Sequence, residues 1–147
     1  MTEESEQQKE LKKLEFIIGK WKTNGKVRAT DNSPEIIIKG NDSYEFLAND
    51  HFILHVVNIM MGDEQVDNVE IIYFDNVNQN YPMQSFDNLG KYTTMRRHII
   101  ENKFILSGDK IRSTLTYNVE TTEMSAFWER SDNGIKWVPW MDLKLQK

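Results

Sequence analysis

The sequence contains no cysteine. This absence excludes disulfide bonds, thiolate metal sites and a cysteine nucleophile. A chain without disulfides fits a reducing compartment, so a cytoplasmic location is expected. The start of the chain agrees, because residues 1–10 are polar and acidic and lack the basic and apolar regions of a signal peptide.

Long hydrophobic runs and an excess of positive charge are also missing. The longest apolar segment, residues 53–61, is interrupted by His55 and Asn58 and is far shorter than the roughly 20 residues that cross a bilayer as a helix. No membrane span is therefore predicted. The net charge is -5, which argues against nucleic acid as a partner because phosphate binding needs clustered basic side chains.

The chain is long enough for one domain. Its 147 residues suit a single sizeable core, and 39% hydrophobic residues is too apolar a composition for a disordered chain. We expect disorder over residues 1–6 and a single domain over residues 7–147.

An amphipathic pattern predicts a helix over residues 7–18, where apolar residues recur at helical spacing between charged ones. Ser5 is the expected N-cap, with Gln8 three residues later to complete a capping box. Gly19 is expected to end the helix. We interpret the segment as a helix that packs one face on the body or acts as a lid over one end.

From Lys20 onward the hydrophobic period changes from helical spacing to two. Trp21 and Thr23 alternate with lysines, which is typical of a strand with one polar face. About ten short strands follow, with turn signals about every 8–12 residues, as in an all-β sandwich or barrel. Short connections place chain neighbours side by side, and closing the sheet removes its free edges. We predict an all-β, closed antiparallel up-and-down barrel with an N-terminal helix capping one end.

Two turns carry specific expectations. The Gly40-Asn41-Asp42 run separates strand patterns at residues 35–39 and 43–47, which suggests a bulge or a hairpin. The Asp132-Asn133-Gly134 run predicts a type I′ hairpin, because Asn and Gly tolerate positive φ.

Three groups of motifs resemble a known family. They are Leu14-Glu15-Phe16-Ile17-Ile18-Gly19-Lys20-Trp21, then Ile72-Tyr73-Phe74-Asp75 followed by Tyr81, and finally Phe127-Trp128-Glu129-Arg130 with Lys136-Trp137 and Pro139-Trp140-Met141. The first holds the Gly-x-Trp signature of lipocalins and their calycin relatives. The set as a whole is similar to a bacterial family of lipocalin-like domains of unknown function.

The resemblance implies a calycin-type barrel with an interior cavity and no assigned catalytic machinery. It also implies that Trp21 closes the barrel base, with a late basic residue packed on its ring as a cation–π contact. Arg130 and Lys144 are both candidates for that residue.

The three histidines, at positions 51, 55 and 98, give little support to a metal or cofactor site. No His-x-His or His-Glu-x-x-His spacing is present, and we predict no metal. A related family of small barrels binds haem through a histidine near the C-terminus, but this chain has none after His98. Haem bound through His55, His98 or a tyrosine remains a minor alternative, and no cofactor is predicted.

Polar residues on otherwise apolar strands are the candidate ligand contacts. An inward arginine would either pair with an acid such as Glu70, Glu129 or Asp142, or bind an anionic ligand. Arg96 shares a strand face with several polar residues, whereas Arg112 alternates with an apolar neighbour and is expected to face solvent. The predicted ligand-binding residues are His55, Asn58, Tyr73, Tyr92, Arg96, His98, Tyr117 and Trp128.

These patterns favour non-catalytic binding of a small hydrophobic or amphipathic ligand inside the barrel. No Gly-x-Ser-x-Gly elbow, phosphate loop or dinucleotide fingerprint is present, so no catalytic residue is predicted. One alternative is a barrel filled by its own aromatics that acts as a homodimer or a partner-binding module. A haem-binding or enzymatic barrel is the other.

Overall fold

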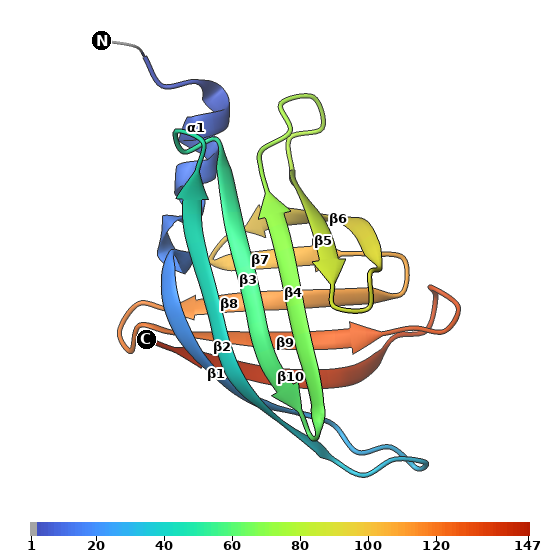
Figure 1. Cartoon of the computed structure of the whole chain (residues 1–147). Helices are drawn as coiled ribbons and strands as arrows, with labels where there is room; N and C mark the ends of the chain where they lie inside the picture. Colours follow the sequence, from blue (N-terminus) through green and yellow to red (C-terminus); the bar gives the residue numbers. More distant parts are fainter. Residues whose placement is uncertain (1–2) are drawn as a thin grey trace.

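A computed structural model describes residues 3–147, which form a closed antiparallel barrel (Figure 1). Each strand pairs with its neighbours in the chain, and the last strand pairs with the first to close the ring. The predicted up-and-down barrel is confirmed. Its ten strands are β1 (Gly19–Val27), β2 (Ile36–Leu47), β3 (Phe52–Met61), β4 (Glu64–Ile72), β5 (Tyr81–Asp87), β6 (Tyr92–Ile100), β7 (Lys103–Ser107), β8 (Ile111–Asn118), β9 (Glu123–Arg130) and β10 (Val138–Gln146).

The N-terminal segment consists of helix α1 (Glu6–Leu11) and a following 3-10 helix, η1 (Lys12–Ile17). The predicted capping box is present, since the Ser5 side chain accepts from the Gln8 N–H and the Gln8 side chain accepts from the Ser5 N–H. The α-helix begins at Glu6, one residue before the predicted start at residue 7. Residues 1–2 of the predicted disordered segment lie outside the described residues. No helix in residues 3–147 is long and apolar enough to cross a membrane.

Trp21 joins this segment to the barrel. Leu11, Leu14 and Ile17 are fully buried in the same apolar cluster as Trp21. The indole Nε1 of Trp21 donates to the carbonyl of Ile17 at 2.8 Å, so the indole also pairs a backbone oxygen at the end of η1. The helical segment and the tryptophan together fill one end of the barrel.

Lys147 supplies the cation over this tryptophan. Its Nζ lies 4.8 Å from the Trp21 ring centroid. Both sequence-based candidates are wrong: Arg130 lies over Trp140, and Lys144 is exposed. The reason is the antiparallel pairing of β10 with β1, which brings the C-terminal end of the chain beside the start of β1.

The second strand is continuous, contrary to the predicted interruption at Gly40. β2 pairs with β3 without a break. A Cβ at Gly40 would lie 2.3 Å from the backbone oxygen of Asn58, so the glycine permits a close backbone approach instead of a turn.

The predicted type I′ hairpin before β10 is also wrong. A loop over residues 131–137 joins β9 to β10, and only Gly134 in it has positive φ, at 76°. The loop is organised by side chains, because Ser131 Oγ accepts from the Gly134 N–H and Asn133 Oδ1 accepts from the Lys136 N–H.

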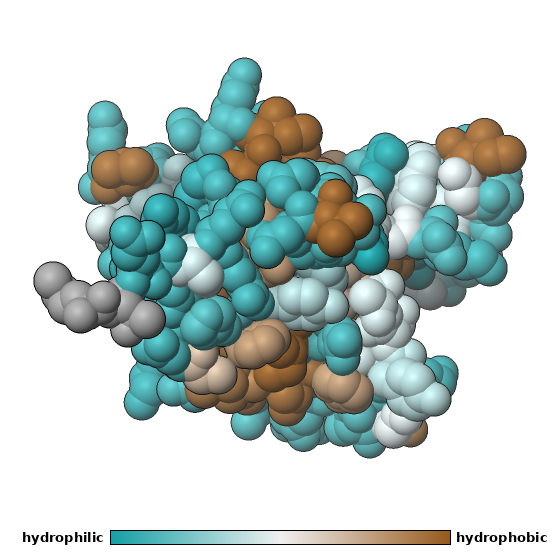
Figure 2. Space-filling model, turned by 90° about the horizontal axis from the view of Figure 1, so that it is seen from above, coloured by the Kyte–Doolittle hydropathy of each residue, from teal (hydrophilic) through white to brown (hydrophobic). Residues whose placement is uncertain are grey.

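The barrel interior is filled at the helix end and hollow towards the other. A large apolar cluster spans the helix end and includes Trp21, Phe104 and Met124. A smaller cluster at the opposite end contains Ile38 and Met141. A cavity of about 690 Å³ is lined by residues from both clusters, so the barrel is not filled throughout by its own side chains. The outer face seen from above is mainly hydrophilic, with apolar residues in small groups (Figure 2).

Candidate functional site

The interior cavity is the candidate functional site. It is lined largely by apolar side chains such as Val57, Ile59 and Leu143, and by a small set of charged and hydroxyl groups. This combination of an apolar wall and few polar groups is typical of small-molecule sites, and the volume of about 690 Å³ lies in their usual range.

A row of hydrogen-bonded polar side chains crosses the wall from β1 to β5. His55 donates from Nε2 to Asp42 Oδ1 at 2.7 Å and from Nδ1 to Glu70 Oε1. Thr23 donates to the other oxygen of Asp42, and Ser85 donates to the other oxygen of Glu70 at 3.1 Å. All five residues are buried. These hydrogen bonds give each carboxylate oxygen in the row a protein donor.

The row arises from strand alternation combined with register. His55 lies opposite Glu70 in the β3–β4 ladder, and Glu70 lies opposite Ser85 in the β4–β5 ladder. Side chains that are directly opposite share a face of the sheet, so all three point into the barrel. Tyr44, opposite His55 on β2, stacks its ring on the imidazole with 3.9 Å between centroids.

Electrostatics favour an imidazolium at the centre of the row. Burial disfavours the charged form and is the largest single influence, but the combined effect of Glu70 and Asp42 is greater and raises the pKa of His55 to about 9. Burial alone would raise the pKa of Glu70, yet the charge of His55 and its hydrogen bond lower it. Burial raises the pKa of Tyr44 well above its usual value, which keeps the phenol neutral.

Arg97, on β6, is the second interior cation. Its side chain is 5% exposed, lines the cavity, and lies over the Phe104 ring with 4.7 Å from Cζ to the centroid. Its Nε is buried without a hydrogen-bond partner, and no carboxylate in residues 3–147 lies within salt-bridge distance of it. A buried N–H donor without a partner is energetically unfavourable, so Nε of Arg97 is suited to receive a hydrogen-bond acceptor.

Two of the sequence-predicted ligand contacts line the cavity. His55 is buried in its wall, and Trp128 on β9 contributes a half-buried indole. Tyr73 and Tyr117 are half-buried elsewhere: Tyr73 packs edge-on against Phe52, and Tyr117 packs against Phe16.

The other four predicted contacts point outward, which corrects the expectation that they face the ligand. Asn58, Tyr92, Arg96 and His98 are all exposed. On β6 the error was one of phase, because the inward set is Met95, Arg97 and Ile99 and not the even-numbered residues. Arg96 instead donates outside the barrel, at 3.1 Å to Asp75 and 2.8 Å to Asn80.

Sequence reasoning missed Arg97, for which the sequence holds only a weak signal. Its neighbours two residues away on either side, Met95 and Ile99, are both apolar, and strand alternation places all three on one face. Asp42 and Thr23 had no comparable signal, because Asp42 was assigned to an interruption and Thr23 to an ordinary strand face. Arg112 pairs with Glu129 at 2.9 Å, with its side chain 42% exposed, close to the expected solvent-facing position.

The geometry does not support His55 or His98 as a metal or haem ligand. Both ring nitrogens of His55 bond to carboxylates on opposite sides, and His98 is exposed on the outer surface. Within residues 3–147, no three or more histidine and carboxylate side chains are grouped to hold a metal ion.

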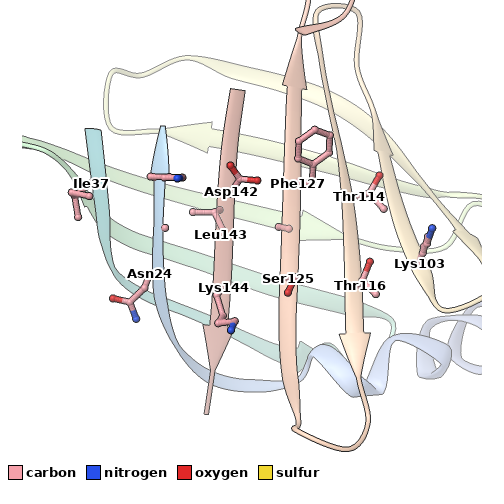
Figure 3. A pocket seen from close by; sticks show the side chains of 13 residues that line it. Asn24, Ile37, Lys103, Thr114, Thr116, Ser125, Phe127, Asp142, Leu143 and Lys144 are labelled. Atoms are coloured by element: carbon pink, nitrogen blue, oxygen red, sulfur yellow. The ribbon is translucent and has the colours of Figure 1, made fainter. Parts of the chain in front are cut away.

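A second hollow lies on the outer surface over β1, β10, β9 and β8 (Figure 3). Its volume is about 780 Å³, and Asn24, Ser125 and Lys144 are among the polar side chains around it. Among residues 3–147, none of the buried side-chain atoms that lack a hydrogen-bond partner belongs to a residue that lines this hollow. The outer hollow therefore has no feature that calls for a specific ligand.

Comparison with known proteins identifies the family. Residues 6–131 match the family described as "Protein of unknown function (DUF1579)", a span that covers most of the barrel. No curated protein matches the chain. The chain therefore belongs to the DUF1579 family of proteins of unknown function.

Proposed function

We propose that this protein binds a small amphipathic anion inside the barrel, with the acidic group of the ligand on Arg97 and its apolar part in the hollow end. The observation that carries the proposal is the Arg97 guanidinium, which is buried on the cavity wall and has an Nε without a partner. A carboxylate would supply a charge-assisted acceptor in a place that water reaches poorly.

The charged row beside Arg97 favours an anion over a cation. Asp42 and Glu70 would be the anchors for a cationic ligand, but each already accepts from His55 and from a hydroxyl. Among the described residues, Nε of Arg97 is a buried donor that has no hydrogen-bond partner, so the unmet hydrogen-bonding capacity beside the row belongs to a cation.

The apolar part of the wall supports the amphipathic character. Ile59 and Met141 are buried side chains that line the cavity away from the helix, and Trp128 and Trp140 meet edge-on at 6.2 Å beside them. A hydrocarbon chain in contact with these groups would gain about 25 cal/mol for each Å² removed from water.

Kinship with lipocalin-like barrels is part of the proposal. Its support is the combination of a closed meander, a helical segment over one end, and Trp21 buried there under a cation. The homodimer or partner-binding module that the sequence leaves open as an alternative is not part of this proposal.

The test is a titration with an environment-sensitive fluorescent fatty acid, followed by competition with oleate and with oleyl alcohol, its uncharged counterpart. We expect saturable binding that oleate displaces better than the alcohol. Arg97→Met should weaken oleate binding about tenfold or more, because a hydrogen-bonded charge contact is lost.

Arg96→Met is the matched control, because Arg96 is the adjacent residue with the same charge but points outward. It should leave oleate binding within about twofold of the native value. No saturable binding to protein whose circular dichroism shows a folded sheet would contradict the proposal. Equal loss in both variants would also contradict it, because long-range charge would then explain the effect.

A further inference from the structure

Three buried side-chain polar atoms in residues 3–147 lack a hydrogen-bond partner, and all three belong to residues that line the interior cavity. They are Nε of Arg97, Nε1 of Trp128 and Oδ1 of Asn68. Buried polar atoms are normally paired, and leaving one unpaired is unfavourable. Their occurrence around one cavity indicates that the occupant of the cavity supplies the missing partners.

The three atoms sit at two levels of the barrel. Arg97 lies opposite Tyr81, near the helix end, where Tyr81 donates to the carbonyl of Glu10 in α1. Asn68 lies opposite Asp87, where β5 ends at the far rim. Trp128 contacts Trp140 near the start of β10, at that same rim. The carboxylate on Arg97 is therefore at a different level from the other two residues.

Asn68 and Trp128 also belong to opposite walls. Asn68 is on β4 and Trp128 is on β9, which lie five strands apart in the ring of ten. An atom on one wall needs a hydrogen-bond donor, and an atom on the other needs an acceptor. A hydroxyl is the smallest group that can serve either, since it donates to an amide oxygen and accepts from an indole N–H.

We propose that the ligand is a hydroxylated amphipathic carboxylate, with its carboxylate on Arg97 and at least one hydroxyl in its apolar part at the level of Asn68 and Trp128. This inference rests on the proposed function and specifies the ligand class of the same site. The cavity wall selects against a plain hydrocarbon chain, because such a chain covers both polar atoms without pairing them.

The experiment measures displacement of the fluorescent fatty acid by three acids of equal chain length: octadecanoate, 12-hydroxyoctadecanoate and 9,10-dihydroxyoctadecanoate. We expect at least one hydroxylated acid to bind the native protein about tenfold more tightly than octadecanoate. The readout is the ratio of the two affinities, so a general loss of affinity in a variant does not affect it.

Trp128→Phe and Asn68→Leu each remove one unpaired atom and leave an apolar side chain of comparable size in its place. The affinity ratio should fall towards one in at least one of them. Trp137→Phe is the control, because Trp137 lies under Arg112 and does not line the cavity, so the ratio should keep its native value. Two independent variants keep the test valid if one of them does not fold.

Equal binding of plain and hydroxylated acids by the native protein would overturn this inference and leave the proposed function intact. A preference that survives in both variants would overturn it as well. Failure of every acid to displace the probe would overturn the proposed function together with this inference.

Discussion

His55 lies directly opposite Glu70 in the β3–β4 ladder, and its Nδ1 donates to the Glu70 carboxylate inside the barrel. The other ring nitrogen donates to Asp42 at 2.7 Å. The imidazole is thus held between two carboxylates on neighbouring strands. This arrangement makes β2, β3 and β4 depend on one another for charge as well as for backbone pairing.

Glu70→Gln is expected to destabilise the protein by about 2–4 kcal/mol, because it leaves a buried imidazole with one carboxylate in place of two. The free energy of unfolding in urea measures the effect. Glu129→Gln is the control: its partner Arg112 is 42% exposed, so the loss should stay below about 1 kcal/mol. Equal losses in the two variants would contradict the importance of the interior row.

Stability should decrease on the alkaline side through His55. Its pKa is raised from 6.5 to about 9 on folding, so its contribution is fully present below pH 6.5 and is lost as pH rises through about 9. The limiting slope is about 1.4 kcal/mol per pH unit for one proton. Urea unfolding between pH 6 and about 10 measures it.

His55→Gln should flatten this alkaline limb, whereas His98→Gln, at an exposed position, should retain it. The pKa of Glu70 is lowered on folding. The free energy of unfolding should therefore also decrease on the acid side, as pH falls below 4.5, which is the ordinary pKa of a glutamate. An alkaline limb unchanged in His55→Gln would show that another group produces it.

Trp21→Phe is expected to lower the free energy of unfolding by about 2–3 kcal/mol. The substitution removes buried ring volume and leaves the Ile17 carbonyl without its indole donor. Lys147→Met removes only the exposed cation over the ring, so it should reduce stability by less than about 1 kcal/mol. If the two variants lost equal stability, the cation and not the buried ring would dominate this end of the barrel.

Gly40→Ala is expected to cost more than about 2 kcal/mol, because the new Cβ would lie 2.3 Å from a backbone oxygen of β3. Gly90→Ala is the comparison: apart from its own chain neighbours, no described residue has an atom within 4 Å of its Cβ position, so its positive φ of 79° is what opposes the change, by about 1 kcal/mol. Thermal unfolding of the two variants separates steric conflict from backbone strain. A smaller loss in Gly40→Ala than in Gly90→Ala would contradict the close approach of β2 to β3.

The alternation rule explains both the success and the failure of site prediction. It placed His55 on the inner face, where the structure has it, because its neighbours two residues away are apolar and the strand is the most apolar in the chain. On β6 both phases contain apolar and polar residues, so alternation alone did not select the inward one. Arg97 was therefore overlooked in favour of Arg96, which is one residue away and on the other side of the wall.

The amino-acid sequence by itself determined the architecture. Period-two strands, short turns, a capped N-terminal helix and Trp21 after Gly19 all depend on local spacing, and they suffice to predict a closed meander with one covered end. Only the tertiary structure decided the composition of the site. Asp42, His55, Glu70 and Ser85 lie on four different strands, and the offset between strands, which no single strand pattern encodes, brings them into one row. Closure of the barrel then places Arg97 on the same cavity and leaves its Nε without a hydrogen-bond partner among residues 3–147, because its surroundings are set by packing across the ring and not by its neighbours in the chain.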